Sequence, residues 1–94
     1  MDNNKFNTSY FSLPKEEIRK LSEEERKKEY TKQLQYIYEA LKEKGYNPIS
    51  QLIGFLLSED PTYITAHKNA RIIAQRLDRY EALEILLDNF LNQH

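Results

Sequence analysis

Helix start signals recur along this 94-residue chain and constrain its fold more than any other feature. Asn47-Pro48 and Asp60-Pro61 each place a side-chain oxygen that can cap a helix just before a proline. The φ angle of proline already suits the first helical turn, so each pair is typical of a helix start. No segment alternates apolar and polar residues with a period of two. We therefore predict an all-α fold without a sheet.

The longest helix is predicted between Ser22 and Gly45. Ser22 and Glu25 have the spacing of a capping box, in which each side chain accepts a hydrogen bond from the other residue's backbone N–H. Gly45 is typical of the left-handed residue after a helix end. Between them the apolar residues form one stripe with the period of a helix: Tyr30, Leu34, Ile37, Tyr38 and Leu41.

Two shorter helices are predicted on either side of Asp60-Pro61. Between residues 49 and 57 apolar side chains cover most of the helical circumference, so we expect this helix to be central. After at most one turn near Tyr63, Thr65 is predicted to cap the next helix. Its inner face is expected to consist of small and branched residues: Ala66, Ala70, Ile73, Ala74 and Leu77.

The last helix is predicted to begin at Asp78 and Glu81, which have capping-box spacing. Its periodicity places Ile85 on the outer side. The residues expected to face inward are Ala82, Leu83, Leu86, Leu87, Phe90 and Leu91.

A chain of this length is expected to form one hydrophobic core. We assign residues 14–94 to a single helical domain, a compact bundle of about four to five short helices. Residues 1–13 are polar, and their few aromatic side chains follow no period, so we predict a flexible arm. The helical part has more apolar surface than one small core covers, which predicts a homodimer. The expected dimer or core surface consists of Ile49, Leu52, Phe55, Leu56, Leu86 and Phe90.

The sequence contains no pattern that predicts a catalytic, metal or cofactor site. It has no cysteine, and its two histidines, His67 and His94, are too few for an all-histidine metal site. Gly45 and Gly54 do not form a phosphate-binding loop. No apolar run approaches the roughly 18 residues of a membrane helix. We therefore expect a cytoplasmic protein that is not an enzyme, takes no cofactor and does not insert into membranes.

A row of polar and basic residues falls on one side of the helix predicted from Thr65: Lys68, Arg71, Gln75 and Arg79. One interpretation is a solvated face paired with Glu81 or Glu84. The other is an anion site for nucleic-acid phosphate or for a phosphorylated side chain. His67, near the start of this helix, is interpreted as a partly exposed surface residue rather than a general base.

Two blocks of sequence resemble the IreB family of small bacterial regulatory phosphoproteins. Residues 37–49 read Ile-Tyr-Glu-Ala-Leu-Lys-Glu-Lys-Gly-Tyr-Asn-Pro-Ile, and residues 54–64 read Gly-Phe-Leu-Leu-Ser-Glu-Asp-Pro-Thr-Tyr-Ile. Ala70-Arg71, Arg79 and Glu81 continue the resemblance. It implies an all-helical homodimer without enzymatic activity. It also implies phosphorylation of an N-terminal threonine by a transmembrane serine/threonine kinase that monitors the cell envelope, reversed by a cognate phosphatase.

Thr8 is similar in placement to a phosphothreonine of the family, whereas an earlier family threonine is replaced near Lys5. Ser9 and Ser12 are further hydroxyl residues of the arm whose modification stays open. The sequence departs from the family pattern at Thr65, where a proline is usual, and at Tyr80, which replaces an acidic residue. The charged stretch from residue 14 to residue 28 is also longer than the family pattern.

We therefore expect a signalling protein whose folded part binds an unknown downstream protein and whose arm is phosphorylated at Thr8 to change that binding. One hypothesis for the mechanism is that the phosphate contacts Lys68, Arg71 and Arg79. The alternative function is a nucleic-acid-associated helical module that uses the same basic helix face. The net charge of −1 makes nucleic acid the less favoured partner.

Overall fold

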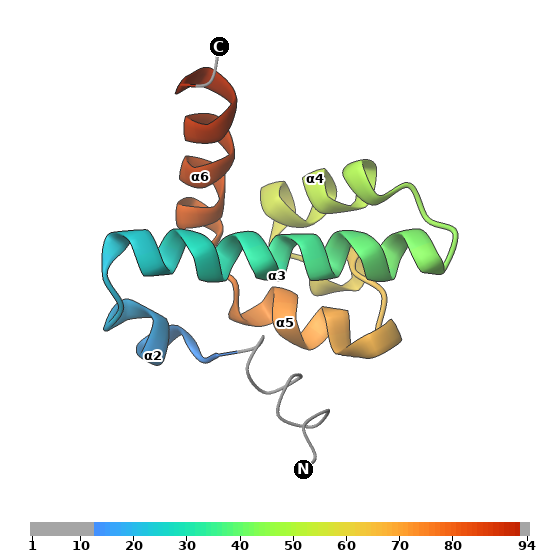
Figure 1. Ribbon diagram of the computed structural model, residues 1–94. Helices are drawn as coiled ribbons and strands as arrows, with labels where there is room; N and C mark the ends of the chain where they lie inside the picture. The colour runs from blue at the N-terminus through green and yellow to red at the C-terminus, as the bar shows by residue number, and fades with distance from the viewer. Residues whose placement is uncertain (1–12, 93–94) are drawn as a thin grey trace.

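The computed structural model describes residues 13–92, and every regular element in that range is helical, which confirms the all-α prediction. Helix α3 is the axis of the molecule, because α2, α4, α5 and α6 all contact it (Figure 1). The elements in chain order are α2 (Lys15–Arg19), α3 (Glu23–Glu43), α4 (Pro48–Ser58), the 3₁₀ turns η1 (Pro61–Tyr63) and η2 (His67–Asn69), α5 (Ala70–Arg76) and α6 (Arg79–Asn92).

Both ends of α3 are fixed as predicted. The Glu25 N–H donates to Ser22 Oγ over 3.1 Å, and the Ser22 N–H donates to Glu25 Oε1 over 3.0 Å, which completes the capping box. At the other end Gly45 has φ +84°, and the Tyr46 N–H donates to the Leu41 carbonyl over 3.0 Å. This is the hydrogen-bond pattern of a Schellman motif, in which a left-handed residue lets the chain satisfy the last helical carbonyls.

The predicted stripe of α3 forms the centre of the core. Tyr30, Leu34, Ile37 and Leu41 are buried, and Tyr38 is half-buried. Ala40 of α3 and buried residues from α2, α4, α5, α6 and the segments that flank α5 join them: Ile18, Phe55, Leu56, Ile64, Ala70, Ile73, Ala74, Leu77, Ala82 and Ile85. Helix α3 thus supplies one continuous apolar surface on which the shorter elements assemble.

The prediction that residues 49–57 form a central helix is wrong. In α4 only Phe55 and Leu56 are buried, whereas Ile49, Ile53 and Leu57 are 57%, 52% and 78% exposed. Helix α4 lies along one side of α3 and packs otherwise on η1. The long helix occupies the centre because its core face is longer, which leaves much of the apolar circumference of α4 uncovered.

The helix predicted from Thr65 begins later. Thr65 Oγ1 accepts a hydrogen bond from the His67 N–H over 3.1 Å, which forms a local turn ahead of η2 and does not cap α5. Lys68 and Asn69 have φ angles of +56° and +63°, which interrupt the helical path, and α5 starts at Ala70. Ala66 is consequently exposed, whereas the remaining residues of the predicted inner face are buried.

Helix α6 starts as predicted, but the side of the helix that packs against the core is the one predicted to face solvent, with Ile85. The Glu81 N–H donates to Asp78 Oδ1 over 3.1 Å, as expected for a cap. Ala82 and Ile85 are its buried residues. Ala82 faces inward as predicted, whereas the other residues predicted inside are between 38% and 65% exposed: Leu83, Leu86, Leu87, Phe90 and Leu91. Figure 1 shows why, because α6 crosses α3 near its own start and then projects away from the bundle.

A buried carboxyl group lies on α3. Glu29 is 5% exposed, and its side chain shares a hydrogen bond with that of Gln33. Among the described residues no partner contacts its second oxygen, Oε2. Burial raises the pKa of Glu29 above its ordinary value, and the nearby Lys32 charge and the Gln33 hydrogen bond oppose this only in part. Ionised Glu29 is therefore expected to reduce the stability of the fold.

We expect Gly45→Ala to lower the free energy of unfolding by about 1 kcal/mol, because an L-residue is strained at positive φ. A Cβ at this position meets no atom within 4 Å, so the loss comes from the backbone alone. Urea denaturation measures it. Gly45→Asn serves as the matched control, because asparagine tolerates the left-handed region and should lose less. Equal stability of the wild type and Gly45→Ala would contradict this backbone argument.

We expect Glu29→Gln to raise the free energy of unfolding at about pH 7 and to gain little at about pH 4. The folded protein keeps the Glu29 proton to higher pH than the unfolded chain does, so the wild type loses stability as the pH rises through the raised pKa. Urea denaturation at both pH values tests this, with Glu39→Gln at an exposed position of α3 as control. A loss of stability that is larger at about pH 7 than at about pH 4 would show that the ionised carboxylate stabilises the core and would contradict this argument.

Candidate interaction surface

The three predicted cations do not share one helix face. Lys68 lies in η2, Arg71 in α5 and Arg79 at the start of α6. Extended backbone at Leu77, with ψ 130°, separates α5 from α6. The prediction of a stripe on a single helix is therefore wrong, because that helix is interrupted on both sides of α5. The nucleic-acid alternative, which relied on the same basic residues, stays a prediction.

Lys68 belongs to a polar cluster that joins the turn η2 to the end of α3. Lys68 Nζ lies 3.2 Å from Glu43 Oε2, and His67 Nε2 lies 2.8 Å from Glu43 Oε1. The Tyr36 hydroxyl donates to the Lys68 carbonyl over 2.8 Å. Hydrogen bonds from His67 and then Lys68 lower the pKa of Glu43 below its ordinary value. Sequence reasoning missed Glu43, because its partners lie more than twenty residues away.

Arg71 is used within the fold as well. Its Nε donates to the Ile64 carbonyl over 2.8 Å, in a partly buried position. This bond ties α5 to the extended residue that follows η1. Arg71 thus stabilises the connection between two elements with at least one of its donors.

Arg79 joins the end of α4 to the start of α6. One terminal nitrogen of its guanidinium pairs with Glu59 Oε2 at 2.5 Å, and the other donates to the Leu56 carbonyl. Leu56 lies in the last turn of α4, where carbonyls lack helical partners. Glu59 follows that turn with φ +67°, a left-handed conformation that is uncommon for glutamate. The sequence suggests Glu81 or Glu84 as partners of the basic residues, but Arg79 pairs with Glu59.

A cavity of about 440 Å³ surrounds Arg79. Lys15 of α2 and Glu59 contribute charged side chains to its wall, and Tyr80 contributes an aromatic ring. Residues from α4, η1, α5 and the connection between α5 and α6 complete the wall: Phe55, Pro61, Ala74, Gln75, Leu77 and Asp78. The cavity wall therefore combines two cations and two carboxylates with apolar side chains.

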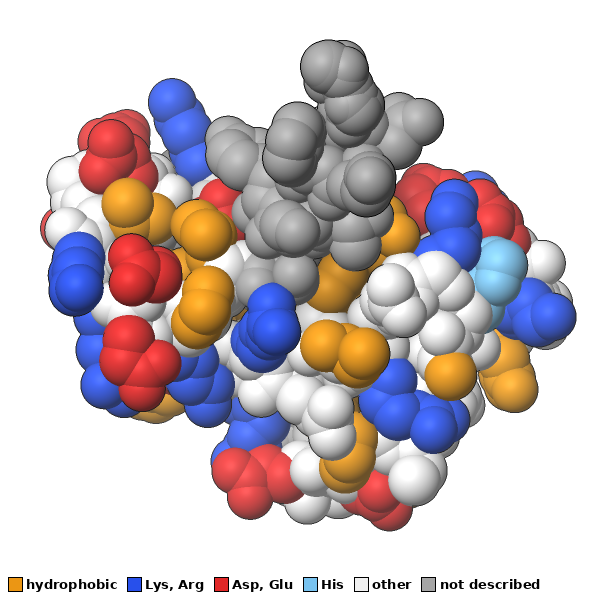
Figure 2. Space-filling view, turned by 90° about the horizontal axis from the view of Figure 1, so that it is seen from below, with side chains coloured by type: hydrophobic (Ala, Val, Ile, Leu, Met, Phe, Trp, Pro, Cys, Tyr) orange, Lys and Arg blue, Asp and Glu red, His pale blue; other side chains and the backbone are white. Residues whose placement is uncertain are grey.

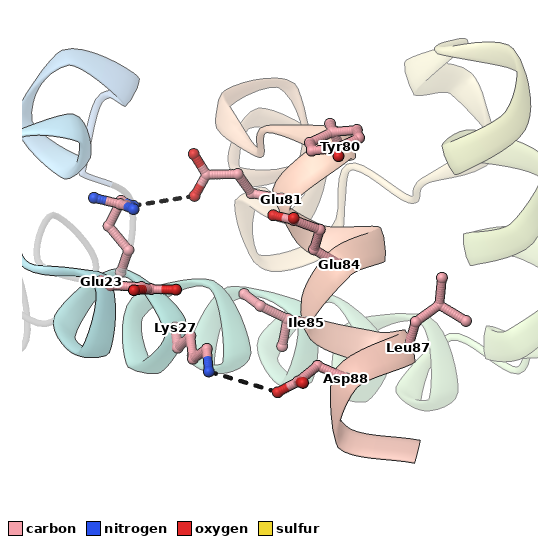
Figure 3. A pocket seen from close by; sticks show the side chains of 9 residues that line it. Glu23, Lys27, Tyr80, Glu81, Glu84, Ile85, Leu87 and Asp88 are labelled. Carbon is pink, nitrogen blue, oxygen red and sulfur yellow. Dashed lines mark hydrogen bonds and ion pairs between the residues drawn. The ribbon is translucent and has the colours of Figure 1, made fainter. Parts of the chain in front are cut away.

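A second cavity, of about 450 Å³, lies where α6 crosses α3 (Figure 3). Arg26 Nε pairs with Glu81 Oε1 at 3.2 Å, and Lys27 Nζ pairs with Asp88 Oδ2 at 3.5 Å. Figure 3 shows Ile85 between these two pairs, pointing from α6 towards α3. Four carboxylates line this cavity against the two cations, so its net charge is negative and does not favour an anion: Glu23, Glu81, Glu84 and Asp88. The pairs instead explain why the Ile85 side of α6 faces the core.

An apolar groove of about 390 Å³ runs between α3, α4 and α6. Four of the six residues predicted for the dimer or core surface line it: Ile49, Leu52, Leu56 and Leu86. Of the other two, Phe55 is buried in the core and Phe90 is 65% exposed further along α6. The structure thus brings the predicted apolar residues of α4 and α6 to one groove and leaves most of them accessible.

Residues 13–92 were also considered for metal-binding groups and membrane-spanning helices. No group of three or more candidate ligand side chains is placed to hold a metal ion in the described part of the chain. None of the described helices has the length and apolar character to cross a membrane. Figure 2 shows acidic and basic side chains interspersed on the face seen from below. The predicted phosphorylation site Thr8, together with Ser9, Ser12 and His94, lies outside the described residues.

Comparisons with known proteins agree with this architecture and identify the family. The family model described as IreB regulatory phosphoprotein matches residues 14–92. A UPF0297 protein of Ruminiclostridium cellulolyticum is 59% identical over 58 residues, which cover 62% of this chain and 66% of that protein. A UPF0297 protein of Clostridioides difficile is 53% identical over 60 residues, which cover 64% of this chain and 71% of that protein. Because the family model extends over most of the chain, this protein belongs to the IreB family of regulatory phosphoproteins.

Proposed function

We propose that this protein is a non-enzymatic regulator in a bacterial serine/threonine kinase pathway of the cell envelope, acting in the cytoplasm. A kinase phosphorylates Thr8 in the arm of residues 1–13, and a cognate phosphatase removes the phosphate. The folded part binds a downstream protein, and phosphorylation changes that binding. The observation that carries the proposal is the match to a regulatory phosphoprotein family over residues 14–92.

The charge of the protein makes such a modification effective. A phosphate adds nearly two negative charges at neutral pH, whereas the unmodified chain has a net charge of only −1. One modification therefore changes the electrostatic character of the whole molecule. Its effect on a partner is greatest where the phosphate lies close to the surface that the partner contacts.

We also propose that two copies of the protein associate through α4 and α6. Ile49, Leu57 and Phe90 are each more than half exposed, on helices that border the same apolar groove. Exposed apolar surface of this kind on a small protein is typical of an interface. A second copy covers it most simply, because the same groove and the same projecting helix are then present on both partners.

We expect sedimentation equilibrium at micromolar concentration to show a dimer for the wild type and a monomer for Phe90→Glu. A buried charge opposes association, and the expected loss is at least about tenfold in the dimerisation constant. Asn89→Glu adds the same charge at the neighbouring exposed position of α6 and should leave the dimer intact. Circular dichroism establishes that both variants keep their helices. A wild type that is monomeric throughout this range would disprove the dimer.

We expect phosphopeptide mapping from cells with and without the kinase to find a kinase-dependent phosphate on Thr8. Thr8→Val, which keeps the shape of the side chain but lacks the hydroxyl, should remove that phosphate. Ser9→Ala and Ser12→Ala are the matched controls and should retain it. A kinase-dependent phosphate that persists in Thr8→Val would move the site to another residue of the arm.

A further inference from the structure

The cavity around Arg79 lies where the arm joins the described part of the chain. Lys15 is the first residue of α2 and contributes to the cavity wall together with Glu59 and Arg79. Only Leu13 and Pro14 separate Lys15 from the twelve residues that precede the described range. The N-terminal end of the described part therefore lies beside a cavity lined by two cations, Lys15 and Arg79, and two carboxylates, Glu59 and Asp78.

Thr8 can reach this cavity without any change in α2. It precedes Lys15 by seven residues, and an extended chain spans about 3.3 Å per residue, or roughly 23 Å in total. The folded part itself measures 40 × 31 × 23 Å. This reach is longer than a cavity of about 440 Å³ is wide. Thr8 can therefore approach any residue that lines the cavity.

Another anion can replace the Glu59 carboxylate that pairs with Arg79. The Glu59 side chain is 68% exposed and that of Arg79 is 30% exposed, so the ion pair is accessible to solvent. Exposed pairs of this kind contribute little to stability, typically about 0–1 kcal/mol. A phosphate dianion carries about twice the charge of a carboxylate and can accept two parallel hydrogen bonds from a guanidinium.

We infer that phosphorylated Thr8 docks into this cavity on its own chain, where its phosphate displaces Glu59 from Arg79 and pairs with Lys15. The inference rests on the proposed phosphorylation of Thr8. It replaces the predicted three-cation stripe with two cations that the fold places together, Lys15 and Arg79, and leaves Lys68 and Arg71 in their structural contacts.

Docking would act on the α4–α6 surface directly. The Glu59–Arg79 pair connects the last turn of α4 to the first residue of α6, and residues of both helices line the apolar groove. Exchange of Glu59 for phosphate removes one of the two links that Arg79 makes to the end of α4, since the hydrogen bond to the Leu56 carbonyl remains. The relative placement of α4 and α6, and with it the shape of the groove, then depends on phosphorylation.

A phosphorus NMR titration of the full chain, prepared by semisynthesis with phosphothreonine at position 8, tests the inference. The second pKa of a phosphomonoester is about 6 in water, and nearby cations lower it. We expect it to lie at least about half a unit lower in the intact protein than in a synthetic peptide of residues 1–12 with the same phosphothreonine. Arg79→Gln and Lys15→Gln should each raise it towards the peptide value.

Two further variants make the result specific. Glu59→Gln removes the competing carboxylate and should lower the phosphate pKa further, whereas Lys44→Gln, at an exposed position after α3, should leave it unchanged. Glu59→Gln also keeps the test valid if Arg79→Gln does not fold. A phosphate pKa equal to that of the peptide in all variants would overturn the inference, and a pKa that rises on dilution would place the arm on a second copy. Because the phosphate is introduced chemically, these outcomes are independent of whether a kinase modifies Thr8 in cells.

Discussion

The buried face of α3 is the constraint on which the rest of the structure depends. Four helices contact this one helix, and the described residues contain no sheet or second layer that could hold them in its absence. Its two ends are defined by complete capping motifs, so its length and the direction in which each neighbouring segment leaves are fixed by local hydrogen bonds. The short helices α2 and α5 are too brief to be stable alone and acquire their stability from this contact.

Polar contacts near helix ends determine how the short elements are oriented on that face. Glu43 holds the turn η2 at one end of α3, Arg26 holds α6 near the other, and Arg79 connects α4 with α6. Each contact joins residues that are at least twenty positions apart in sequence. Individually such exposed or partly buried pairs add little free energy, but they select one orientation among several that bury similar apolar area. The surface left for partners, the apolar groove and the exposed side of α6, is a result of that selection.

The sequence predicted the positions of the helices better than the side of each helix that is buried. The Ser22–Glu25 box, Gly45 and the Asn47 cap are local signals, and each forms as expected. The two positive φ angles at Lys68 and Asn69 were not recognisable, because neither residue is glycine and the alanines around them favour a helix. Periodicity identified the wider apolar side of α6 but could not show that the narrower side, with Ile85, meets α3, since that choice depends on distant ion pairs. For the same reason the cations of the candidate site could be listed from the sequence but their true neighbours, Glu43 and Glu59, could not.

The shallow attachment of α6 has a consequence for the dynamics of the molecule. Of its 14 residues only Ala82 and Ile85 are buried, both within the first half. Opening this helix exposes little additional apolar surface, so its free energy of local unfolding lies well below that of α3. The backbone amides of α6 are therefore expected to exchange with solvent faster than those of α3. A partner that covers α6 would suppress this local opening, and part of its binding free energy would be used to order the helix.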